Sequence, residues 1–466
     1  MNRYQKLFSN TAILGVGTFA SKLLVFLLMP LYTALLSTSQ YSTAELITST
    51  ANLIIPVACV GIANGIFRFA AERNADREAV FSSSIALLGG GTLIFLVLSP
   101  IFFFIPYFDG YAWLIPLYVI LANLQSVFSQ YVRAIDRTKL FAVQGILNTF
   151  LTVLFNLLFL LVWDMGVTGY VLSVILGNLI TSLILFFAAR LWRVFRIAKI
   201  DRALMRELLR FSLPMIPTTV CWLITDLSDR YLVTYFCGDA INGIYSAAYK
   251  IPTVVTLISS IFMQAWQFSA VAESSDEEGN RRFYGEVFGG FVSVVMIGAG
   301  GLVLLSPILC DLLLHASYAQ AAYYMPTLLC AAAVEAIVSF LATVYMVKKR
   351  SMNSFVTAMS GALLNIVLNL LMIPHFGALG AAVATLASYV LVFGLRTVDT
   401  RRYIRFRLHL PRLLLSIGAL LLSCAFMTLR WSGWQVVVPL TTALIVAINI
   451  PFLWKSVRGV IQKRRP

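Results

Sequence analysis

The sequence has little charge and few of the residue types that build metal centres or disulfide frames. Only 12% of its 466 residues are charged and 60% are hydrophobic, and the mean hydropathy is +0.87. A soluble globular domain needs more polar side chains than this to cover its surface, so the composition excludes that class. The six cysteines are scattered singly without a CxxC spacing, and the three histidines are far apart. Neither a metal site nor a disulfide frame is therefore predicted.

Acidic residues are scarce too, with 20 Asp and Glu against 35 Lys and Arg, a formal charge of +15. The basic residues lie in short segments between apolar runs, which is typical of membrane topology and not of nucleic-acid binding. The chain also lacks a nucleotide-hydrolysis motif, and its first apolar run is too long for a cleavable signal peptide. We expect a membrane protein that is not an enzyme, with no catalytic residues, cofactor or bound metal.

The sequence does contain a series of apolar runs, each long enough for a helix to cross a bilayer. There are about fourteen by this criterion. They cover approximately residues 9–36, 42–67, 80–106, 111–132, 140–162, 168–189, 211–236, 241–270, 283–310, 319–346, 352–373, 377–395, 410–429 and 434–454. The predicted fold class is an all-α polytopic membrane protein.

The connections between these runs alternate in charge. If the N-terminus is cytoplasmic, the Lys and Arg residues of the connections fall on the cytoplasmic side, and only Arg430 falls on the other. One missed or extra span would destroy this alternation, because cytoplasmic loops are enriched in Lys and Arg. We therefore expect both termini in the cytoplasm.

An internal repeat divides the chain. FS at residue 8 recurs at 211, YSTA at 41 recurs as YSAA at 245, and NLL at 156 recurs at 369. Six spans per copy is an even number, so both copies start on the same side and form parallel repeats. The predicted parts are an N-lobe (1–200), a C-lobe (201–407), and an extra helix pair with a basic cytoplasmic tail (408–466).

Ionisable residues gather in the seventh and eighth spans, where each costs about 2.5–3.5 kcal/mol on insertion scales and marks a candidate functional site. Asp226, Asp229 and Arg230 lie in the seventh span and Lys250 in the eighth. Asp226 can pair with Arg230 four residues later, or with Lys250 on the next helix. Such pairs lock two helices together, or they form a polar cavity wall that meets an anionic cargo or a coupling cation.

Further ionisable residues lie in other spans. Lys22 is near the middle of the first span, and it either faces a water-filled cavity or pairs with a carboxylate such as Glu45. Glu335 is either a proton or sodium site or a hydrogen-bonded core residue. Arg68, at the inner end of the second span, either anchors the helix in the cytoplasm or contacts a phosphate.

Small and amide residues inside spans have structural interpretations. The run Gly89-Gly90-Gly91 permits close packing of helices. The amides of Asn156, Asn365 and Asn369 are expected to tie helices together by hydrogen bonds.

Three segments carry a resemblance to a known family. DLSDRYLV at 226–233, GIYSAAYKIP at 243–252 and NLLMIPHFGALGAA at 369–382 resemble the polysaccharide-biosynthesis (Wzx-type) oligosaccharide flippases. These belong to the multidrug/oligosaccharidyl-lipid/polysaccharide (MOP) exporter superfamily. The resemblance extends over essentially the whole chain. It implies two parallel six-helix lobes plus a C-terminal helix pair, with alternating access between them.

The implied function is that of a flippase for an undecaprenyl-pyrophosphate-linked glycan. It would carry this cargo from the inner to the outer leaflet of a bacterial cytoplasmic membrane, for cell-surface polysaccharide or cell-wall synthesis. The implied partners are this glycan, membrane lipids, and a glycan polymerase or glycosyltransferases. The implied site residues are cavity cations for the pyrophosphate, Lys22, Lys250, Arg230 and Arg68, and candidates for ion coupling, Asp226, Asp229 and Glu335.

Three other functions compete with this one. A lipid II (MurJ-like) flippase is a close variant, although the acidic residues beside Arg230 make the site less purely cationic. A cation-coupled multidrug (MATE-like) extruder would use a site led by the carboxylates of Asp226, Asp229 and Glu335. A membrane enzyme or glycan polymerase would need charged outer loops, and the outer connections are nearly free of charge.

The double substitution Lys22→Ala with Lys250→Ala tests the cationic cavity. We expect it to abolish complementation of a strain that lacks its own flippase, because the pyrophosphate would lose both lysines. The measurement is the amount of surface polysaccharide or peptidoglycan. Unchanged amounts would contradict a cationic cavity and favour the carboxylate-led extruder.

Overall fold

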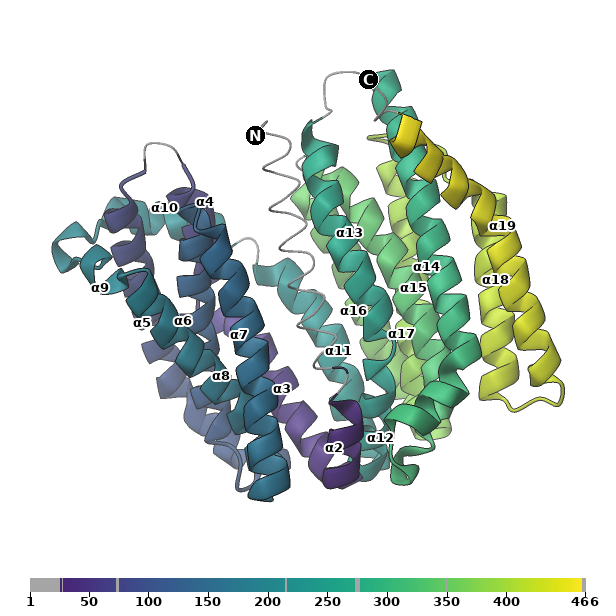
Figure 1. Cartoon of the computed structure of the whole chain (residues 1–466), viewed down its shortest axis with the longest axis horizontal. Coiled ribbons are helices and arrows are strands. Elements are labelled where there is room, and N and C mark those ends of the chain that lie inside the picture. Colours follow the sequence, from purple (N-terminus) through teal and green to yellow (C-terminus); the bar gives the residue numbers. More distant parts are fainter. Residues whose placement is uncertain are drawn as a thin grey trace. The chain divides into compact units, whose positions relative to one another are not determined.

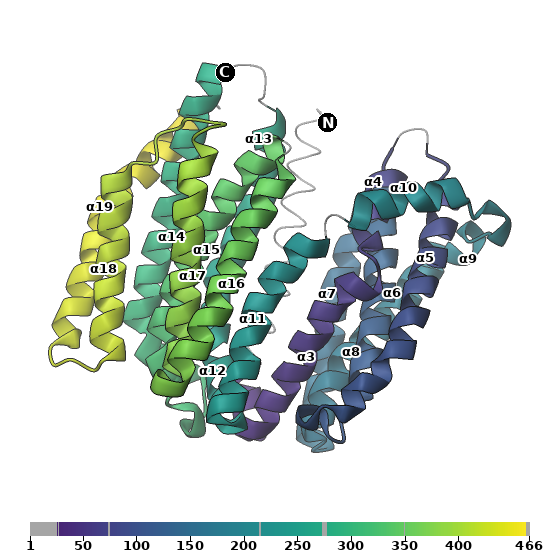
Figure 2. The ribbon, with the colours of Figure 1, turned by 180° about the vertical axis from the view of Figure 1, so that it is seen from behind.

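The computed structural model describes residues 26, 28–72, 75–213, 216–272, 277–348 and 350–462, and this part of the chain contains helices and no strand. The chain divides into two compact units, Met1–Leu227 and Ser228–Pro466. Each unit is a bundle of long helices (Figure 1, with the reverse view in Figure 2). The division falls within α11 (Ile216–Cys237), whereas the predicted lobe boundary near residue 200 lies before it. The predicted three-part organisation stays a prediction.

Unit 1 contains short and long helices in chain order. They are α2 (Met29–Leu35), α3 (Thr38–Ala58), α4 (Ile62–Ala70), α5 (Arg77–Leu98), η1 (Ser99–Phe104), η2 (Pro106–Phe108), α6 (Leu114–Ala134), α7 (Thr138–Asn156), η3 (Leu157–Val162), α8 (Gly166–Ala188), α9 (Leu191–Val194), η4 (Ile197–Lys199), α10 (Arg202–Ser212) and the start of α11.

Unit 2 continues from α11 with longer helices. They are α12 (Asp239–Lys250), α13 (Thr253–Ala272), α14 (Glu277–Leu313), η6 (Ala316–Tyr318), α15 (Ala321–Val347), α16 (Ser351–Phe376), α17 (Ala378–Thr400), α18 (Leu410–Thr428) and α19 (Trp434–Gln462).

The predicted spans correspond to helices of the structure. Within the described residues, nine helices are long and apolar enough to cross a membrane, or up to eleven spans if each of two bent helix pairs counts as one. Each predicted span from residue 42 onward coincides with a helix or a helix pair, so the all-α polytopic class is confirmed. Most of the predicted span 9–36 lies outside the described residues.

Two spans are bent, each for a local chemical reason. Between α3 and α4 the axis turns by 50° just after Pro56, where Val60 and Gly61 adopt left-handed conformations. Between α12 and α13 it turns by 42° at Pro252, which cannot donate a helical N–H hydrogen bond. A proline and a residue with left-handed conformation both interrupt the helical hydrogen bonds, so the local sequence accounts for each bend.

The predicted repeat has the same local structure in each unit. The NLL motif at Asn156 lies at the end of α7, and the one at Asn369 lies in the last turns of α16. A glycine with positive φ stands at the start of the next helix: Gly166 is the first residue of α8, and Gly377 immediately precedes α17. Glycine suits this turn because it enters the left-handed region without steric cost. Both copies thus fold as antiparallel helix hairpins.

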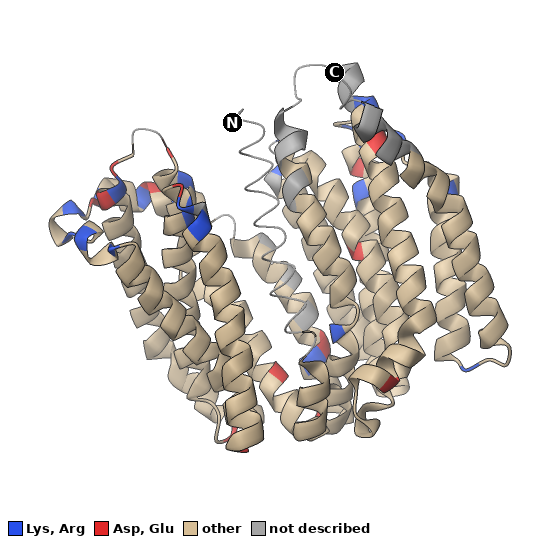
Figure 3. Cartoon of the chain, viewed as in Figure 1, with Lys and Arg blue, Asp and Glu red and all other residues tan. Residues whose placement is uncertain are grey.

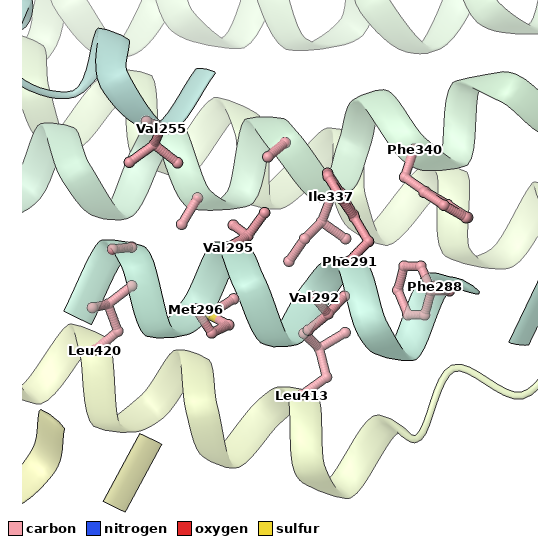
Figure 4. Packing of buried hydrophobic residues seen from close by; sticks show 14 of the residues in the cluster. Val255, Phe288, Phe291, Val292, Val295, Met296, Ile337, Phe340, Leu413 and Leu420 are labelled. Carbon is pink, nitrogen blue, oxygen red and sulfur yellow. The ribbon is translucent and has the colours of Figure 1, made fainter. Parts of the chain in front are cut away.

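Aliphatic and aromatic side chains fill the core of unit 2 around α14 (Figure 4). The ring of Phe340 on α15 stacks on Trp266, with centroids 5.1 Å apart, and on Phe291, 5.5 Å away. The Trp266 indole N–H donates a 3.1 Å hydrogen bond to Thr343 Oγ1, so its polar atom is satisfied inside the core. This packing joins α13, α14 and α15.

Most of the charged residues of unit 1 lie at the end that carries α4, α9 and α10 (Figure 3). There the Lys199 ammonium lies 2.6 Å from the Asp76 carboxylate, and Arg196 lies 3.4 Å from Glu78. The hydrogen bond from Lys199 holds the pKa of the Asp76 carboxyl below its usual value. Backbone N–H groups of Arg196 and Asp201 also donate to serines of α5. The basic connection before α10 is therefore fixed to the start of α5.

The triple glycine of α5 generates a stability prediction. A Cβ atom at Gly91 would collide with the backbone carbonyl of Ala58 on α3, whereas one at Gly89 or Gly90 would meet nothing within 4 Å. We expect Gly91→Ala to lower the thermal unfolding midpoint of the detergent-solubilised protein, because α3 and α5 would be forced apart.

The matched controls are Gly89→Ala and Gly90→Ala. Each should leave the midpoint unchanged or raise it, because alanine in a helix is favoured over glycine by about 1 kcal/mol. Equal effects of the three substitutions would contradict a specific contact at Gly91.

Candidate functional site

A buried carboxylate, that of Asp229, lies on α11 in unit 2 among uncharged hydrogen-bond donors. Its Oδ1 accepts from Asn369 Nδ2 at 2.6 Å and from Asn365 Nδ2 at 3.1 Å. Its Oδ2 accepts from the Tyr245 hydroxyl at 3.0 Å and from Thr385 Oγ1 at 2.5 Å. These five residues are here named the Asp229 cluster. They come from α11, α12, α16 and α17 and join four helices at one point.

The local sequence explains how the donors converge. Asn365 and Asn369 are four residues apart, so both project from the same face of α16. Helix α17 packs against α16 and contributes Thr385. Tyr245 stands in the YSAAY segment of α12, which begins only two residues after α11 ends. A short connection and a helix hairpin therefore bring the four helices together.

The electrostatics of the cluster follow from burial. Asp229 is 1% exposed, and an isolated carboxylate at such a position would be strongly destabilised. A carboxylate offers about four lone-pair sites, and here four donors occupy them. Ser228 Oγ extends the network by donating to Asn365 Oδ1 at 2.8 Å. The cluster can hold a negative charge without a cationic side chain among these five residues.

The atoms of the cluster suit a hard cation or a proton. Carboxylate, amide and hydroxyl oxygens are ligands that hard cations prefer. Asn369 Oδ1 is buried and has no hydrogen-bond partner in the described part of the chain. Across the described ranges, no group of three His, Cys, Asp or Glu residues is arranged to hold a metal ion. The oxygen atoms of the cluster are thus of the type that binds a proton or a small hard cation.

Arg230 follows Asp229 and is also buried. Its Nη1 lies 3.5 Å from Ser246 Oγ, and its guanidinium carbon lies 6.0 Å from the centroid of the Tyr249 ring. Tyr245 and Ser246, which are neighbours on α12, thus contact neighbours on α11. Lys250 is the last residue of α12 and is half-buried. The structure therefore brings Asp229 and Arg230 against the helix that ends in Lys250.

The other predicted site residues are distributed more widely. Lys22 lies outside the described residues, as does the side chain of Asp226. Glu335 is half-buried in α15. Arg68 is in the last turn of α4, where its side chain is 61% exposed and pairs with Glu72 at 3.6 Å. An exposed pair of this kind contributes at most about 1 kcal/mol, so both interpretations of Arg68 stay open.

Glu45, the predicted alternative partner of Lys22, is buried in unit 1 near tyrosines. The Tyr170 hydroxyl donates a 2.8 Å hydrogen bond to Glu45 Oε1. The Tyr170 ring in turn meets Tyr32 edge-on, with centroids 4.8 Å apart, and Tyr41 at 6.2 Å. Unit 1 therefore also buries a carboxylate, but one near aromatic hydroxyls instead of amides.

Sequence reasoning missed several of these side-chain contacts. It treated Asn365 and Asn369 only as helix ties and Tyr245 only as a repeat marker. The signal was the spacing of two amides by four residues, one helical turn apart. The predicted span 377–395 also ends just before Arg396, whereas α17 continues to Thr400 and buries this arginine. There Arg396 donates to the carbonyl of Val338 at 2.9 Å and to Thr357 Oγ1 at 3.0 Å.

Comparisons with known proteins agree with this architecture. The family model described as "Polysaccharide biosynthesis protein" matches residues 7–268, more than half of the chain. No curated protein sequence matches.

Solved structures of similar fold include the lipid II flippase MurJ in an inward closed conformation. It has a TM-score of 0.69 at 14% identity, and the match covers 97% of this chain and 100% of that one. An inward-facing multidrug resistance MATE family transporter of the MOP superfamily gives 0.67 at 12% identity, over 84% and 98%. A MOP superfamily transporter from Pyrococcus furiosus, whose binding pocket is described as of reverse polarity, gives 0.60 at 12% identity, over 84% and 96%. At these identities the likeness establishes the fold.

The repeat supplies a matched pair of substitutions for the Asp229 cluster. Asn369 donates to the Asp229 carboxylate, whereas its counterpart Asn156 donates to the carbonyl of Thr152 in its own helix. We expect Asn369→Ala to lower the free energy of unfolding by about 1.5–3 kcal/mol and Asn156→Ala by about 1 kcal/mol, because hydrogen bonds to charged groups are stronger.

Thermal unfolding of both variants in the same detergent measures the difference. Equal midpoints would mean that Asp229 does not depend on the Asn369 amide.

Proposed function

Because the chain belongs to the polysaccharide biosynthesis protein family, we propose that it moves a polyprenyl-pyrophosphate-linked oligosaccharide from the inner to the outer leaflet of a bacterial cytoplasmic membrane. The family match is the observation that carries this proposal. The all-helical polytopic fold, shared with flippases and exporters of the MOP superfamily, supports it. In the proposed orientation both termini lie in the cytoplasm, and the glycan serves cell-surface polysaccharide or cell-wall synthesis.

We propose that Lys22, Lys250, Arg230 and Arg68 supply positive charge for the pyrophosphate. Arg230 is buried beside the half-buried end of α12, where the Lys250 side chain begins. Cationic groups held away from bulk water bind phosphate more strongly than exposed ones, because the local dielectric is lower. Membrane lipids, and a glycan polymerase or glycosyltransferases that supply or consume the cargo, are the proposed partners.

The Asp229 cluster is proposed as the ion-coupling site, with Asp226 and Glu335 as further candidates. A proton or a small cation on Asp229 would neutralise the carboxylate and change the hydrogen bonds that join α11, α12, α16 and α17. Binding would thereby bias the arrangement of four helices of unit 2, which is what a coupling ion has to do. The position of the cluster on those helices supports this role.

The membrane potential favours the proposed direction of transport. Moving one charge across 100 mV is worth about 2.3 kcal/mol, so a pyrophosphate with about two negative charges gains roughly 4–5 kcal/mol by moving outward. This supports transport without a nucleotide-hydrolysing partner. A cationic drug would be driven inward by the same potential and would need exchange for an ion.

A cation-coupled multidrug extruder is the second candidate. The observation that favours it is the fully buried carboxylate of Asp229, because a carboxylate-led site suits cationic cargo. A lipid II flippase remains a close variant of the main proposal, since it would carry a different glycan on a similar lipid pyrophosphate.

Transport in proteoliposomes tests the proposal. The purified chain is reconstituted with a fluorescent polyprenyl-pyrophosphate oligosaccharide, and a membrane-impermeant quencher reports movement between leaflets. We expect protein-dependent movement in the wild type. With Asp229→Asn we expect a rate lower by about tenfold, the equivalent of about 1.4 kcal/mol, because the coupling site loses its charge.

The matched control is Asp239→Asn, at an exposed position in the first turn of α12, which should leave the rate unchanged. Thermal unfolding of both variants establishes that each is folded. Movement of a cationic dye without movement of the lipid would reject the flippase in favour of the extruder. Equal rates for Asp229→Asn and wild type would reject the coupling role alone.

A further inference from the structure

Two cysteines that are far apart in sequence meet inside unit 2. Cys330 on α15 and Cys424 on α18 have their sulfur atoms 2.9 Å apart, and both residues are buried. Cys424 Sγ also lies 3.0 Å from the Pro326 carbonyl oxygen, one turn earlier on α15. Near the same end of the two helices, the hydroxyls of Thr327 and Thr428 lie 3.4 Å apart. These contacts fix α18 against α15 in one register, with the two thiols facing each other.

The charge pattern assigns this meeting point to the outer half of the membrane. Basic residues follow α15, at Lys348 and Arg350, and precede α18, at Arg405 and Arg407. The positive-inside rule places those two helix ends in the cytoplasm, so the opposite ends face outward. Cys424 is four residues from the outer end of α18, and Cys330 is in the outer half of α15. Both thiols are therefore on the side where bacteria form disulfides.

We propose that Cys330 and Cys424 form a disulfide that links α18 to α15. The two thiols lose two protons and two electrons as the sulfur–sulfur bond forms. The electrons pass to the disulfide of an extracytoplasmic thiol-oxidising protein, which becomes a dithiol through a mixed-disulfide intermediate. This exchange takes place while the outer ends of α15 and α18 assemble, before packing covers the sulfurs. Once buried, the bond is shielded from reductants.

The link has a definite structural consequence. Helices α18 and α19 follow the two predicted six-helix copies, and α15 belongs to the second copy. A bond from Cys424 to Cys330 covalently joins the extra helix pair to the body of unit 2. It closes a chain segment of more than 90 residues, so it restricts the unfolded chain strongly.

Thiol counting on the full-length protein tests the proposal. Membranes from an expressing bacterium are quenched with acid, the denatured protein is blocked with N-ethylmaleimide, and it is then reduced and labelled with a heavy maleimide. We expect the label on two of the six cysteines. Mass spectrometry of the unreduced digest should contain a peptide pair linked through Cys330 and Cys424.

Three variants sharpen the measurement. Cys330→Ser and Cys424→Ser should each abolish labelling after reduction, whereas Cys310→Ser, at another buried cysteine of unit 2, should leave two labelled cysteines. The wild type should have a higher thermal midpoint than either Cys330→Ser or Cys424→Ser, because each of these variants lacks the link. Blocking of all six cysteines before reduction, or a link between other cysteines, would overturn the proposal.

Discussion

Burial of a negative charge in a medium that cannot solvate it is the constraint on which unit 2 depends. Water would normally stabilise the carboxylate of Asp229, and inside a membrane bundle the protein has to replace that solvation. It does so with two amides, a phenol and a hydroxyl on three neighbouring helices. The relative positions of α11, α12, α16 and α17 are therefore set by hydrogen-bond geometry, since apolar packing alone has little directional preference.

The choice of neutral donors has a chemical meaning. A lysine or arginine in direct contact would neutralise Asp229 permanently and leave no attraction for a second cation. Amides and hydroxyls stabilise the charge without adding a positive one. Arg230 is adjacent in sequence, and its guanidinium contacts Ser246 and Tyr249 on α12. The Asp229 carboxylate and the Arg230 guanidinium of α11 are thus contacted by different side chains of α12.

Much of the architecture was predictable. Bilayer thickness sets the length of the apolar runs, and the topology sets which loops carry Lys and Arg, so both can be read from the sequence. Apolar length predicted each helical span from residue 42 onward, and the resemblance in DLSDRYLV and GIYSAAYKIP indicated the family. The Asp229 cluster was only partly predictable. Its carboxylate stands out as a charge in an apolar run, but Thr385 is one of many membrane threonines until α17 packs on α16. The meeting of Cys330 and Cys424 was not foreseeable, because their separation in sequence has no periodic relation to helix packing.

The break between α12 and α13 lies just beyond the helices that the Asp229 cluster joins. Four hydrogen bonds to one carboxylate tie α11, α12, α16 and α17 together, because moving any one of these helices alone would break a bond to a buried charge. The axis of the eighth span changes direction by 42° just beyond Lys250, where Pro252 leaves the helical ladder incomplete. Bending there leaves the cluster intact. The change of direction at Pro252 therefore sets the course of α13 without involving the carboxylate or its four donors.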